Sequence, residues 1–395
     1  MANVLWTSHF VRVSVANMLL FVSLYMLYPV LPVVMASRLS VPITHTGLLY
    51  LVSMLGMLFI GPFYNYLIDE CKRKNIFRWA FVAMIATIAG YALVSSLTEL
   101  LLLCFFQGVA FGLTTTSGIT LAIDVTHASE RNSGNVIFSG ATRLGMILGI
   151  ALGVSLFGLY GFDLLLYISI GIGALGVLML SGVYVPFRAP LVTKICSYDR
   201  FLLPRALLPA FNLALIAFVP GMLLPVLLHS PVRVWVGEVS VPFFAVAAVG
   251  FLLMILLLKF IFRGALKMWL QIVLGLILMI VAITFMSQVI LPQITELLLA
   301  AILFGLSLGM IAPQFLNMFV KLSQHCQRGT ANTTHLLAWE IGITAGIATA
   351  CWMDVSARPE IFYQIGVIST AVALVFFVLV TYPYFKRKKV RSREL

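Results

Sequence analysis

Two ionisable residues lie deep within long apolar stretches of the sequence, and they are the strongest candidates for chemistry. Arg143 lies in the apolar segment 135–158, and Glu340 lies in the apolar segment 332–353. A charged side chain at the centre of a membrane helix costs about 2.5–3.5 kcal/mol on insertion scales, so such residues commonly serve binding or transport. The functional hypothesis is that Glu340 binds a coupling proton or a cationic substrate, while Arg143 neutralises a substrate or a carboxylate. The structural alternative is a buried charge pair, or an Arg143 side chain that extends to the membrane interface.

Membrane-spanning helices are the elements that must position these residues. Of the 395 residues, 62% are hydrophobic and only 10% are charged, whereas an average soluble domain is about one quarter charged. Long continuous apolar runs indicate helices, because the strands of membrane barrels alternate apolar and polar residues over about 10 positions. We therefore predict an all-α membrane protein with twelve transmembrane helices, near residues 10–35, 45–68, 77–97, 99–123, 135–158, 164–186, 206–228, 240–262, 268–290, 296–320, 332–353 and 361–384.

The basic residues fall on one side of this topology. With the N-terminus in the cytoplasm, every Lys and Arg except Arg38, Arg233 and Arg358 lies in a cytoplasmic segment or at the cytoplasmic side of a helix. Because cytoplasmic loops carry an excess of Lys and Arg, this distribution predicts an even number of helices and two cytoplasmic termini. Topology thus accounts for the net charge of +12 without a nucleic-acid partner. We expect a multi-pass protein of the cell inner (plasma) membrane.

Other kinds of chemistry lack the residues that they need. The cysteines show no metal-ligand spacing, and three of them (Cys71, Cys196 and Cys326) fall in cytoplasmic loops, so we expect free thiols and no metal site. No nucleotide-binding loop is present, and the histidines lie at or near helix ends with no convergent acid–base set. We expect a monomer that is not an enzyme and holds no cofactor. Its expected partners are a small-molecule substrate, the lipid bilayer and, as a candidate coupling ion, the proton.

The chain contains an internal repeat with an offset of 197 residues. The segment Thr98–Leu102 recurs as Thr295–Leu299. Such a repeat predicts two six-helix halves in the same orientation. Some secondary transporters are built from two parallel halves of this kind. The expected domains are an N-terminal six-helix bundle (1–187), a cytoplasmic linker (188–205), a C-terminal six-helix bundle (206–385) and a basic cytoplasmic tail (386–395). The same offset relates Gly108 and Gly112 to Gly305 and Gly309, Arg131 and Asn135 to Arg328 and Asn332, and Gly145 and Gly149 to Gly342 and Gly346.

Local motifs resemble those of the major facilitator superfamily, in its exporter-like branch. Between helices 2 and 3 that family carries a Gly-Pro pair, an acidic residue and a closing basic pair, which here are Gly61-Pro62, Asp69 and Arg73-Lys74. Two other motifs match in part. On helix 4, Gln107-Gly108 are present, but Cys104 stands where the family motif has arginine. On helix 5, the three-residue gaps between glycines are typical of exporting antiporters, but Ile150 replaces the motif's proline.

The resemblance implies roles for particular residues. Asp69 matches the position that holds the cytoplasmic side closed in the family, so Asp69 is a candidate gating residue, with Arg73, Asp124 and Arg131 as supporting charges. The alternative for each is an ordinary solvated charge at a loop. Helices 1, 4, 7 and 10 line the family's central cavity, and the matching segments here contain neutral polar candidates for substrate contact. These are Asn17, Tyr25, Tyr28, Gln107, Ser117, Asn212, Gln314 and Asn317, although such residues also bond their own helix or join helices together.

These observations predict a secondary active transporter of small amphipathic solutes that works by alternating access, with proton-coupled efflux as its activity. An uncoupled facilitator or a lipid or lysolipid translocator is the alternative within transport. A non-transporting membrane sensor or scaffold is the alternative from another class.

Overall fold

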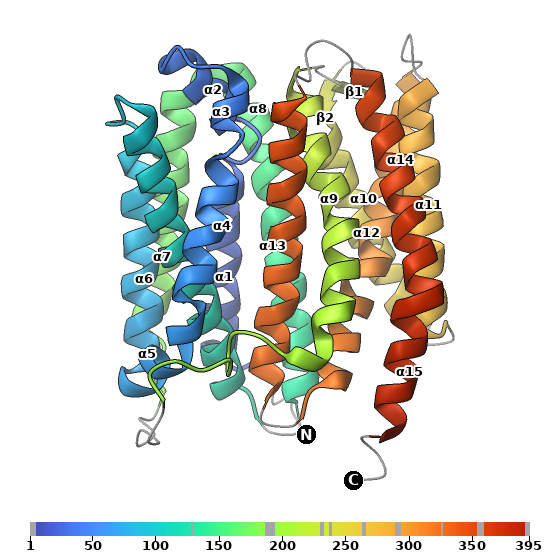
Figure 1. Ribbon diagram of the computed structural model, residues 1–395. Coiled ribbons are helices and arrows are strands. Elements are labelled where there is room, and N and C mark those ends of the chain that lie inside the picture. Colours follow the sequence, from blue (N-terminus) through green and yellow to red (C-terminus); the bar gives the residue numbers. More distant parts are fainter. Residues whose placement is uncertain are drawn as a thin grey trace. The chain divides into compact units, whose positions relative to one another are not determined.

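The computed structural model describes residues 5–127, 130–185, 194–229, 233–236, 239–262, 266–288, 294–324, 327–353 and 359–391. Within these ranges the chain is helical apart from one small hairpin and short connections (Figure 1). Several residues and segments named from the sequence lie outside the described ranges, namely Cys326, His325, Arg358, the linker residues 188–193 and the tail residues 392–395.

Each of the twelve predicted spans overlaps a described helix. The first half of the chain forms α1 (Ser8–Tyr25), α2 (Leu31–Arg38), α3 (Ile43–Thr46), α4 (Leu49–Ile60), η1 (Gly61–Phe63), α5 (Tyr64–Glu70), α6 (Arg73–Gly90), α7 (Leu97–Asp124) and α8 (Arg131–Ser181). The second half forms η2 (Pro204–Ala206), α9 (Leu207–His229), β1 (Arg233–Val236), β2 (Val239–Pro242), α10 (Phe243–Leu256), η3 (Leu257–Ile261), α11 (Met268–Gln288), α12 (Ile294–Leu322), α13 (Arg328–Trp352), α14 (Pro359–Phe376), η5 (Phe377–Thr381) and α15 (Tyr382–Arg391).

Local chemistry explains several of these boundaries. At the start of α7, Ser96 Oγ accepts a hydrogen bond from the Glu99 backbone nitrogen (3.3 Å), and the Glu99 carboxylate accepts one from the Ser95 nitrogen (2.9 Å). The first bond satisfies a donor that the first turn of a helix leaves free, and the second ties the residue before the N-cap to that turn. Inside α8, Gly161 has φ +79°, a left-handed conformation that interrupts the helix and separates two predicted spans.

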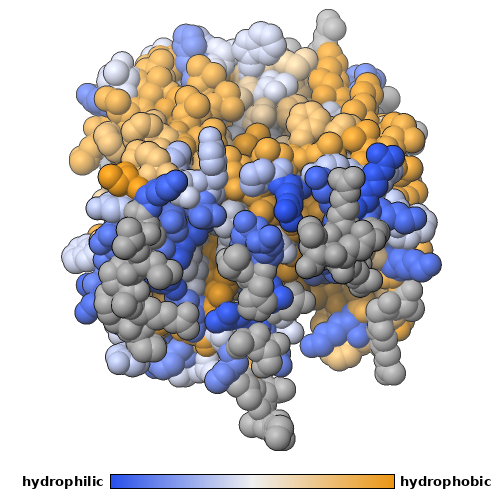
Figure 2. Space-filling view, turned by 60° about the horizontal axis from the view of Figure 1, so that its bottom comes forward, coloured by the Kyte–Doolittle hydropathy of each residue, from blue (hydrophilic) through white to orange (hydrophobic). Residues whose placement is uncertain are grey.

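The apolar faces of the helices are exposed, as expected for helices in contact with lipid. Among the described residues, nine helical segments are long and apolar enough to cross a membrane, and one of them, Ser133–Ser181, contains the break at Gly161. Figure 2 shows hydrophobic residues on the flanks of the helices and hydrophilic residues gathered at the end turned toward the viewer. Large exposed apolar side chains include Leu102, Phe106, Leu178, Leu252, Ile368 and Leu379. In water such a surface would drive aggregation.

The described chain forms two compact units. The first comprises residues 1–204 together with 323–336, so it includes the first two turns of α13. In this unit α1 packs along α8, and α7 packs against α4 and α6 (Figure 1). The second unit comprises residues 205–322 and 337–395, in which α12 packs against α10 and α11, and α14 packs against α9 and α11. The division of the chain into domains at the residues expected from the sequence stays a prediction.

Repeat-related glycines make equivalent close contacts in the two units. A Cβ atom on Gly108 of α7 would lie 1.7 Å from a backbone oxygen of α4, and one on Gly305 of α12 would lie 2.0 Å from a backbone oxygen of α10. Likewise, a Cβ on Gly145 of α8 would lie 2.6 Å from an oxygen of α1, and one on Gly342 of α13 would lie 2.3 Å from an oxygen of α9. The repeat therefore conserves the positions where two helix backbones touch.

We expect Gly108→Ala to destabilise the protein strongly. The new methyl group would meet the Ser53 backbone oxygen at 1.7 Å, and a backbone atom can move away only if α4 and α7 separate. Overpacking of this kind costs about 1–3 kcal/mol or more, which a fall in the melting temperature of the purified protein would report. Gly140→Ala is the matched control, because nothing lies within 4 Å of its added Cβ. A Gly108→Ala variant with the wild-type melting temperature would contradict this account of the contact.

Candidate functional site

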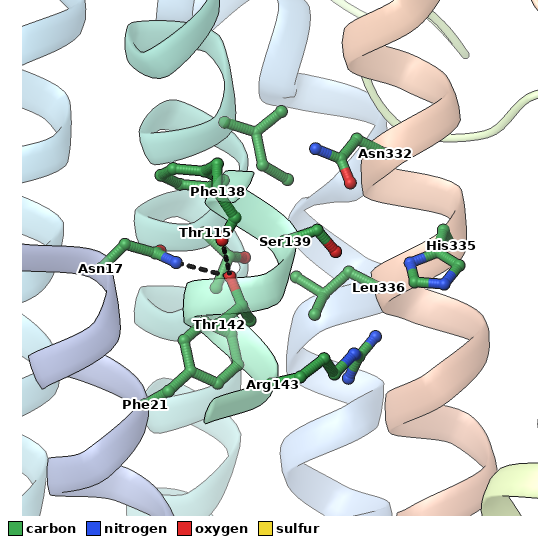
Figure 3. Close-up of a pocket in the computed structure, with 11 residues that line it drawn as sticks. Asn17, Phe21, Thr115, Phe138, Ser139, Thr142, Arg143, Asn332, His335 and Leu336 are labelled. Atoms are coloured by element: carbon green, nitrogen blue, oxygen red, sulfur yellow. Dashed lines mark hydrogen bonds between the residues drawn. The ribbon is translucent and has the colours of Figure 1, made fainter. Parts of the chain in front are cut away.

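A small buried hollow lies within the first unit, between α1, α7, α8 and the first turns of α13 (Figure 3). Its volume is about 10 Å³, which is room for roughly one water molecule. Its lining mixes apolar and polar side chains in an otherwise apolar bundle. The lining residues are Asn17, Phe21, Thr115, Ile119, Phe138, Ser139, Thr142, Arg143, Asn332, His335 and Leu336.

One hydrogen-bond chain fixes the side of the hollow that α1 and α8 form. The Thr142 hydroxyl donates to the Phe138 carbonyl one turn earlier (3.0 Å), which is the usual bond of a threonine within a helix. The Thr142 oxygen in turn accepts a hydrogen bond from Asn17 Nδ2 (2.7 Å). Because both side chains are buried, this bond orients the Asn17 amide and ties α1 to α8.

Arg143 and His335 point toward the space between α8 and α13 (Figure 3). Arg143 is only 4% exposed, and its Nη1 lies 3.0 Å from Met146 Sδ. His335 is 1% exposed and lies in the second turn of α13. His335 therefore lies near the start of its helix, as the sequence predicts, and its side chain is buried within the described chain.

Glu340 also lies on α13, four residues beyond Leu336, and belongs to the second unit. Its residue is 2% exposed, so the carboxyl group is removed from solvent within the described chain. Four residues correspond to about 6 Å of rise along a helix. Along α13, Glu340 therefore follows Leu336 by about one turn.

The candidate gating charges form a cluster at the ends of α5, α6 and α7. Arg73 Nη2 lies 3.1 Å from Asp69 Oδ1, and Arg73 Nη1 donates to Asp124 Oδ2. A residue outside the predicted set completes the cluster, because Arg200 Nη2 lies 2.6 Å from Asp69 Oδ1. Arg131 makes no ion pair with the other members among the described residues, and its Nε is buried without a hydrogen-bond partner there.

These contacts perturb both arginines in the cluster. Burial lowers the pKa of Arg73, but the hydrogen bonds and negative charges of Asp124 and Asp69 outweigh that effect and raise the pKa above its usual value. Burial lowers the pKa of Arg200, and Asp69 offsets only part of that effect. Because a guanidinium ordinarily titrates far above neutral pH, both side chains carry charge under physiological conditions.

The other cavity candidates contact the protein itself. Tyr25 stacks between Phe21 and Tyr28, with ring centroids 5.9 and 4.2 Å apart, and all three are buried. Ser117 donates to the Leu113 carbonyl of its own helix (2.6 Å). Four more hydrogen bonds join helices or neighbouring turns. Tyr91 donates to Gln107 Oε1 (2.6 Å), and Asn212 Nδ2 donates to the Ala373 carbonyl (3.0 Å). Asn317 Nδ2 donates to Gln314 Oε1 (3.2 Å), and Gln314 Nε2 donates to Gln271 Oε1 (2.7 Å). Of the eight candidates, Asn17 alone lines the hollow.

The sequence offered partial signals for the residues that it did not single out. Thr142 directly precedes Arg143, and Asn332 is the repeat counterpart of Asn135, so the sequence places both beside residues that it does single out. Arg200 gave no such signal, because its partner Asp69 lies 131 positions away in the sequence.

An almost wholly helical chain with apolar, membrane-length helices that enclose buried polar side chains defines a multi-pass membrane protein of the transporter class. The Major Facilitator Superfamily model matches residues 13–294. The chain therefore belongs to the Major Facilitator Superfamily, and membrane transport of a small-molecule substrate is the activity of that family. Proteins of this family and fold are typically transporters and not enzymes.

Comparison with known proteins agrees with this assignment. An uncharacterized MFS-type transporter of Bacillus subtilis (strain 168), YtbD, is 25% identical over 166 residues, which span 42% of this chain and 41% of that relative. Three solved structures share the fold at 13–15% identity. The peptide transporter POT has a TM-score of 0.70 (96% of this chain, 95% of that one), the nucleoside transporter NupG 0.66 (94% and 99%), and the human organic anion transporter MFSD10 0.64 (93% and 98%). At these identities the likeness concerns the fold.

Proposed function

We propose that this protein is a secondary active transporter of small amphipathic solutes that works by alternating access. The observation that carries the proposal is the buried hollow, in which polar side chains from α1, α8 and α13 share a space with Phe21 and Phe138. Burial of polar side chains in an apolar bundle costs free energy. A binding site for an amphipathic solute would explain why polar side chains are present there. The polar group of the solute would lie against the polar side chains, and the apolar part of the solute would lie against the aromatic side chains.

Proton-coupled efflux is the form of transport that we propose, with solute and proton moving as antiport partners. Glu340 supports it, because it is a buried carboxyl group inside the apolar helix α13. The glycine spacing in the fifth predicted span, which lies in α8, resembles that of exporting antiporters and supports export. We further propose a monomer in the cell inner (plasma) membrane. Both termini would lie in the cytoplasm, because this orientation puts nearly all basic residues on the cytoplasmic side, as the positive-inside rule requires.

An uncoupled facilitator, or a lipid or lysolipid translocator, is the second candidate. Cys104 favours it, because this residue replaces the arginine of the family's helix-4 motif and is buried, with its Sγ 3.4 Å from the Tyr91 hydroxyl. A neutral thiol at that position cannot attract a counter-charge as arginine does. A membrane sensor or scaffold would show no flux of any solute.

The test is a flux screen in proteoliposomes that contain the purified full-length protein. Small aromatic acids, amides and amines would be followed with and without an imposed pH gradient. Proton-coupled transport predicts accumulation that depends on the gradient and collapses with a protonophore. Flux that only equalises the solute concentration would favour the facilitator, and absence of flux for every solute would contradict transport of this solute class.

A further inference from the structure

Residues 197–203 lie inside the predicted linker 188–205, yet their contacts are those of an ordered part of the first unit. The Phe201 and Leu202 nitrogens donate to the Tyr198 carbonyl (3.1 and 2.9 Å), so the segment contains a compact turn of its own. Three further backbone amides of the segment donate to groups outside it. A linker that only joined the two halves of the chain would not need these outward bonds.

One set of contacts joins the segment to η1 and α5. The Ser197 nitrogen donates to the Pro62 carbonyl (2.9 Å), in the turn that directly precedes α5. Phe201 is 5% exposed and packs edge-on against Tyr64, with ring centroids 5.9 Å apart. Its ring also fills the space beside Gly61, where an added Cβ would lie 2.2 Å from the ring carbon Cε2. The absence of a side chain at Gly61 therefore makes room for this aromatic contact.

A second set of contacts joins the segment to the start of α13. The Arg200 nitrogen donates to Thr330 Oγ1, and the Leu203 nitrogen donates to Thr334 Oγ1 (2.9 Å each). Both threonines are buried and lie one turn apart in residues 328–336, the part of α13 that belongs to the first unit. Because a buried amide that loses its acceptor is unfavourable, these bonds hold the segment against the helix.

The third attachment is the side chain of Arg200. Its Nη2 lies 2.6 Å from Asp69 Oδ1, and the two side chains are only 21% and 12% exposed. Solvent and salt therefore screen this pair less than a fully exposed one. Arg200 also has a left-handed backbone conformation (φ +61°). A non-glycine residue keeps such a conformation only where its surroundings hold it, and here both its amide and its guanidinium are held.

We infer that residues 197–203 form a strap that holds the α5 end of the first unit to the first two turns of α13, with the Arg200–Asp69 pair as its fastening. The strap acts as one unit, because a single compact turn carries all the attachments. Any movement that separates the start of α13 from α5 has to detach the strap from one of them. Arg200 is a positioning residue for Asp69. The strap goes beyond the proposed function and does not depend on it, since the contacts do not involve a solute.

Amide hydrogen exchange, resolved to single residues in the full-length protein in nanodiscs, tests the strap. Its readout is the protection factor, which corrects for the intrinsic exchange rate of each side chain. We expect Arg200→Gln to lower the protection of the three outward amides, at positions 197, 200 and 203, at least tenfold. The Leu203 amide is the most informative, because the substitution leaves its acceptor, Thr334 Oγ1, in place.

Two amides inside the strap serve as internal references. The Phe201 and Leu202 amides donate to the Tyr198 carbonyl, which moves with them when the strap detaches. Their protection should therefore change less than twofold in Arg200→Gln. A matched control is Arg205→Gln, which removes an exposed charge two residues beyond the strap and should change none of these amides.

Two more variants separate the fastening from backbone strain. Arg200→Lys keeps the positive charge and should retain part of the protection that Arg200→Gln loses. Arg200→Gly adopts the left-handed conformation freely, but it lacks the guanidinium and should lose protection as Arg200→Gln does. Full protection in Arg200→Gly would contradict the Arg200–Asp69 pair as the fastening.

Unchanged protection of the Leu203 amide in Arg200→Gln would overturn the strap, because the attachments would then be independent of one another. Equal losses in Arg205→Gln, or at Phe201 and Leu202, would also overturn it, because they would show a general loosening of the chain. All of these outcomes can be read whether or not the protein transports a solute, so the strap and the proposed function are tested separately.

If the Arg200 variants do not fold, Thr330→Val and Thr334→Val decide the question. Each valine removes one hydroxyl acceptor at nearly constant shape. The strap predicts that either variant lowers the protection of both the Arg200 and the Leu203 amides. A loss confined to the amide whose own acceptor was removed would contradict the strap.

Discussion

Glu340→Gln should abolish solute accumulation driven by a pH gradient and leave solute exchange down its own gradient intact. Glutamine resembles the protonated carboxyl group in shape, but it can neither bind nor release a proton. Glu340 is 2% exposed, so the substitution tests a group that solvent does not reach in this conformation. We expect at least a tenfold loss of gradient-driven accumulation in proteoliposomes, with the rate of counterflow within about twofold of wild type.

The control for Glu340→Gln is Glu360→Gln, which removes an exposed carboxylate at the first turn of α14. This variant should accumulate solute normally. Retention of pH-driven accumulation in a well-folded Glu340→Gln protein would remove Glu340 from the coupling mechanism. If accumulation, exchange and thermal stability all fall together, Glu340 has a structural role as the partner of a buried positive charge. Glutamine would leave that charge uncompensated.

Asp69→Asn should reduce turnover about tenfold with little loss of folded protein. The substitution removes the negative charge that Arg73 and Arg200 share, at 3.1 and 2.6 Å, while Arg73 keeps its bond to Asp124. A hydrogen bond to a charged group contributes about 1.5–3 kcal/mol, and about 1.4 kcal/mol is enough for a tenfold change in a conformational equilibrium. Initial flux rates and the melting temperature, measured on the same preparation, would separate turnover from stability.

Glu70→Gln is the matched control for Asp69→Asn, because Glu70 is the next residue, is exposed, and forms no ion pair within the described chain. A double-mutant cycle adds a sharper criterion. Asp69→Asn and Arg200→Gln together should cost little more than Asp69→Asn alone, since both remove the same pair. Additive effects, or wild-type flux in Asp69→Asn, would reduce Asp69 to an ordinary loop charge.

The secondary structure and the membrane class could be read from the sequence because both depend on local properties. Each predicted span overlaps a described helix, because a bilayer requires long apolar segments whose backbone groups bond internally. The repeat could be read for a related reason. Its glycines mark backbone contacts between equivalent pairs of helices in each half. At Gly108 no residue with a Cβ atom fits, because that atom would lie 1.7 Å from the Ser53 backbone oxygen.

The candidate site was predictable only in part. Asn17 and Arg143 line the hollow, whereas Gln107, Asn212, Gln314 and Asn317 bond to other residues of the bundle. The type of a polar residue does not reveal its partner, since the amide that binds a solute is chemically the same as the amide that joins two helices.

By itself, the sequence determined the helical fold, the repeat and the location of Arg143 and Glu340 inside apolar helices, because hydrophobicity is a property of short stretches of chain. The tertiary structure alone decided that Asn17 meets Thr142, that Asn332 and His335 face Arg143, and that Arg200 reaches Asp69. Such contacts join residues more than one hundred positions apart, and they depend on how each helix is rotated about its axis. Packing against neighbouring helices sets that rotation, and no local pattern in the sequence encodes it.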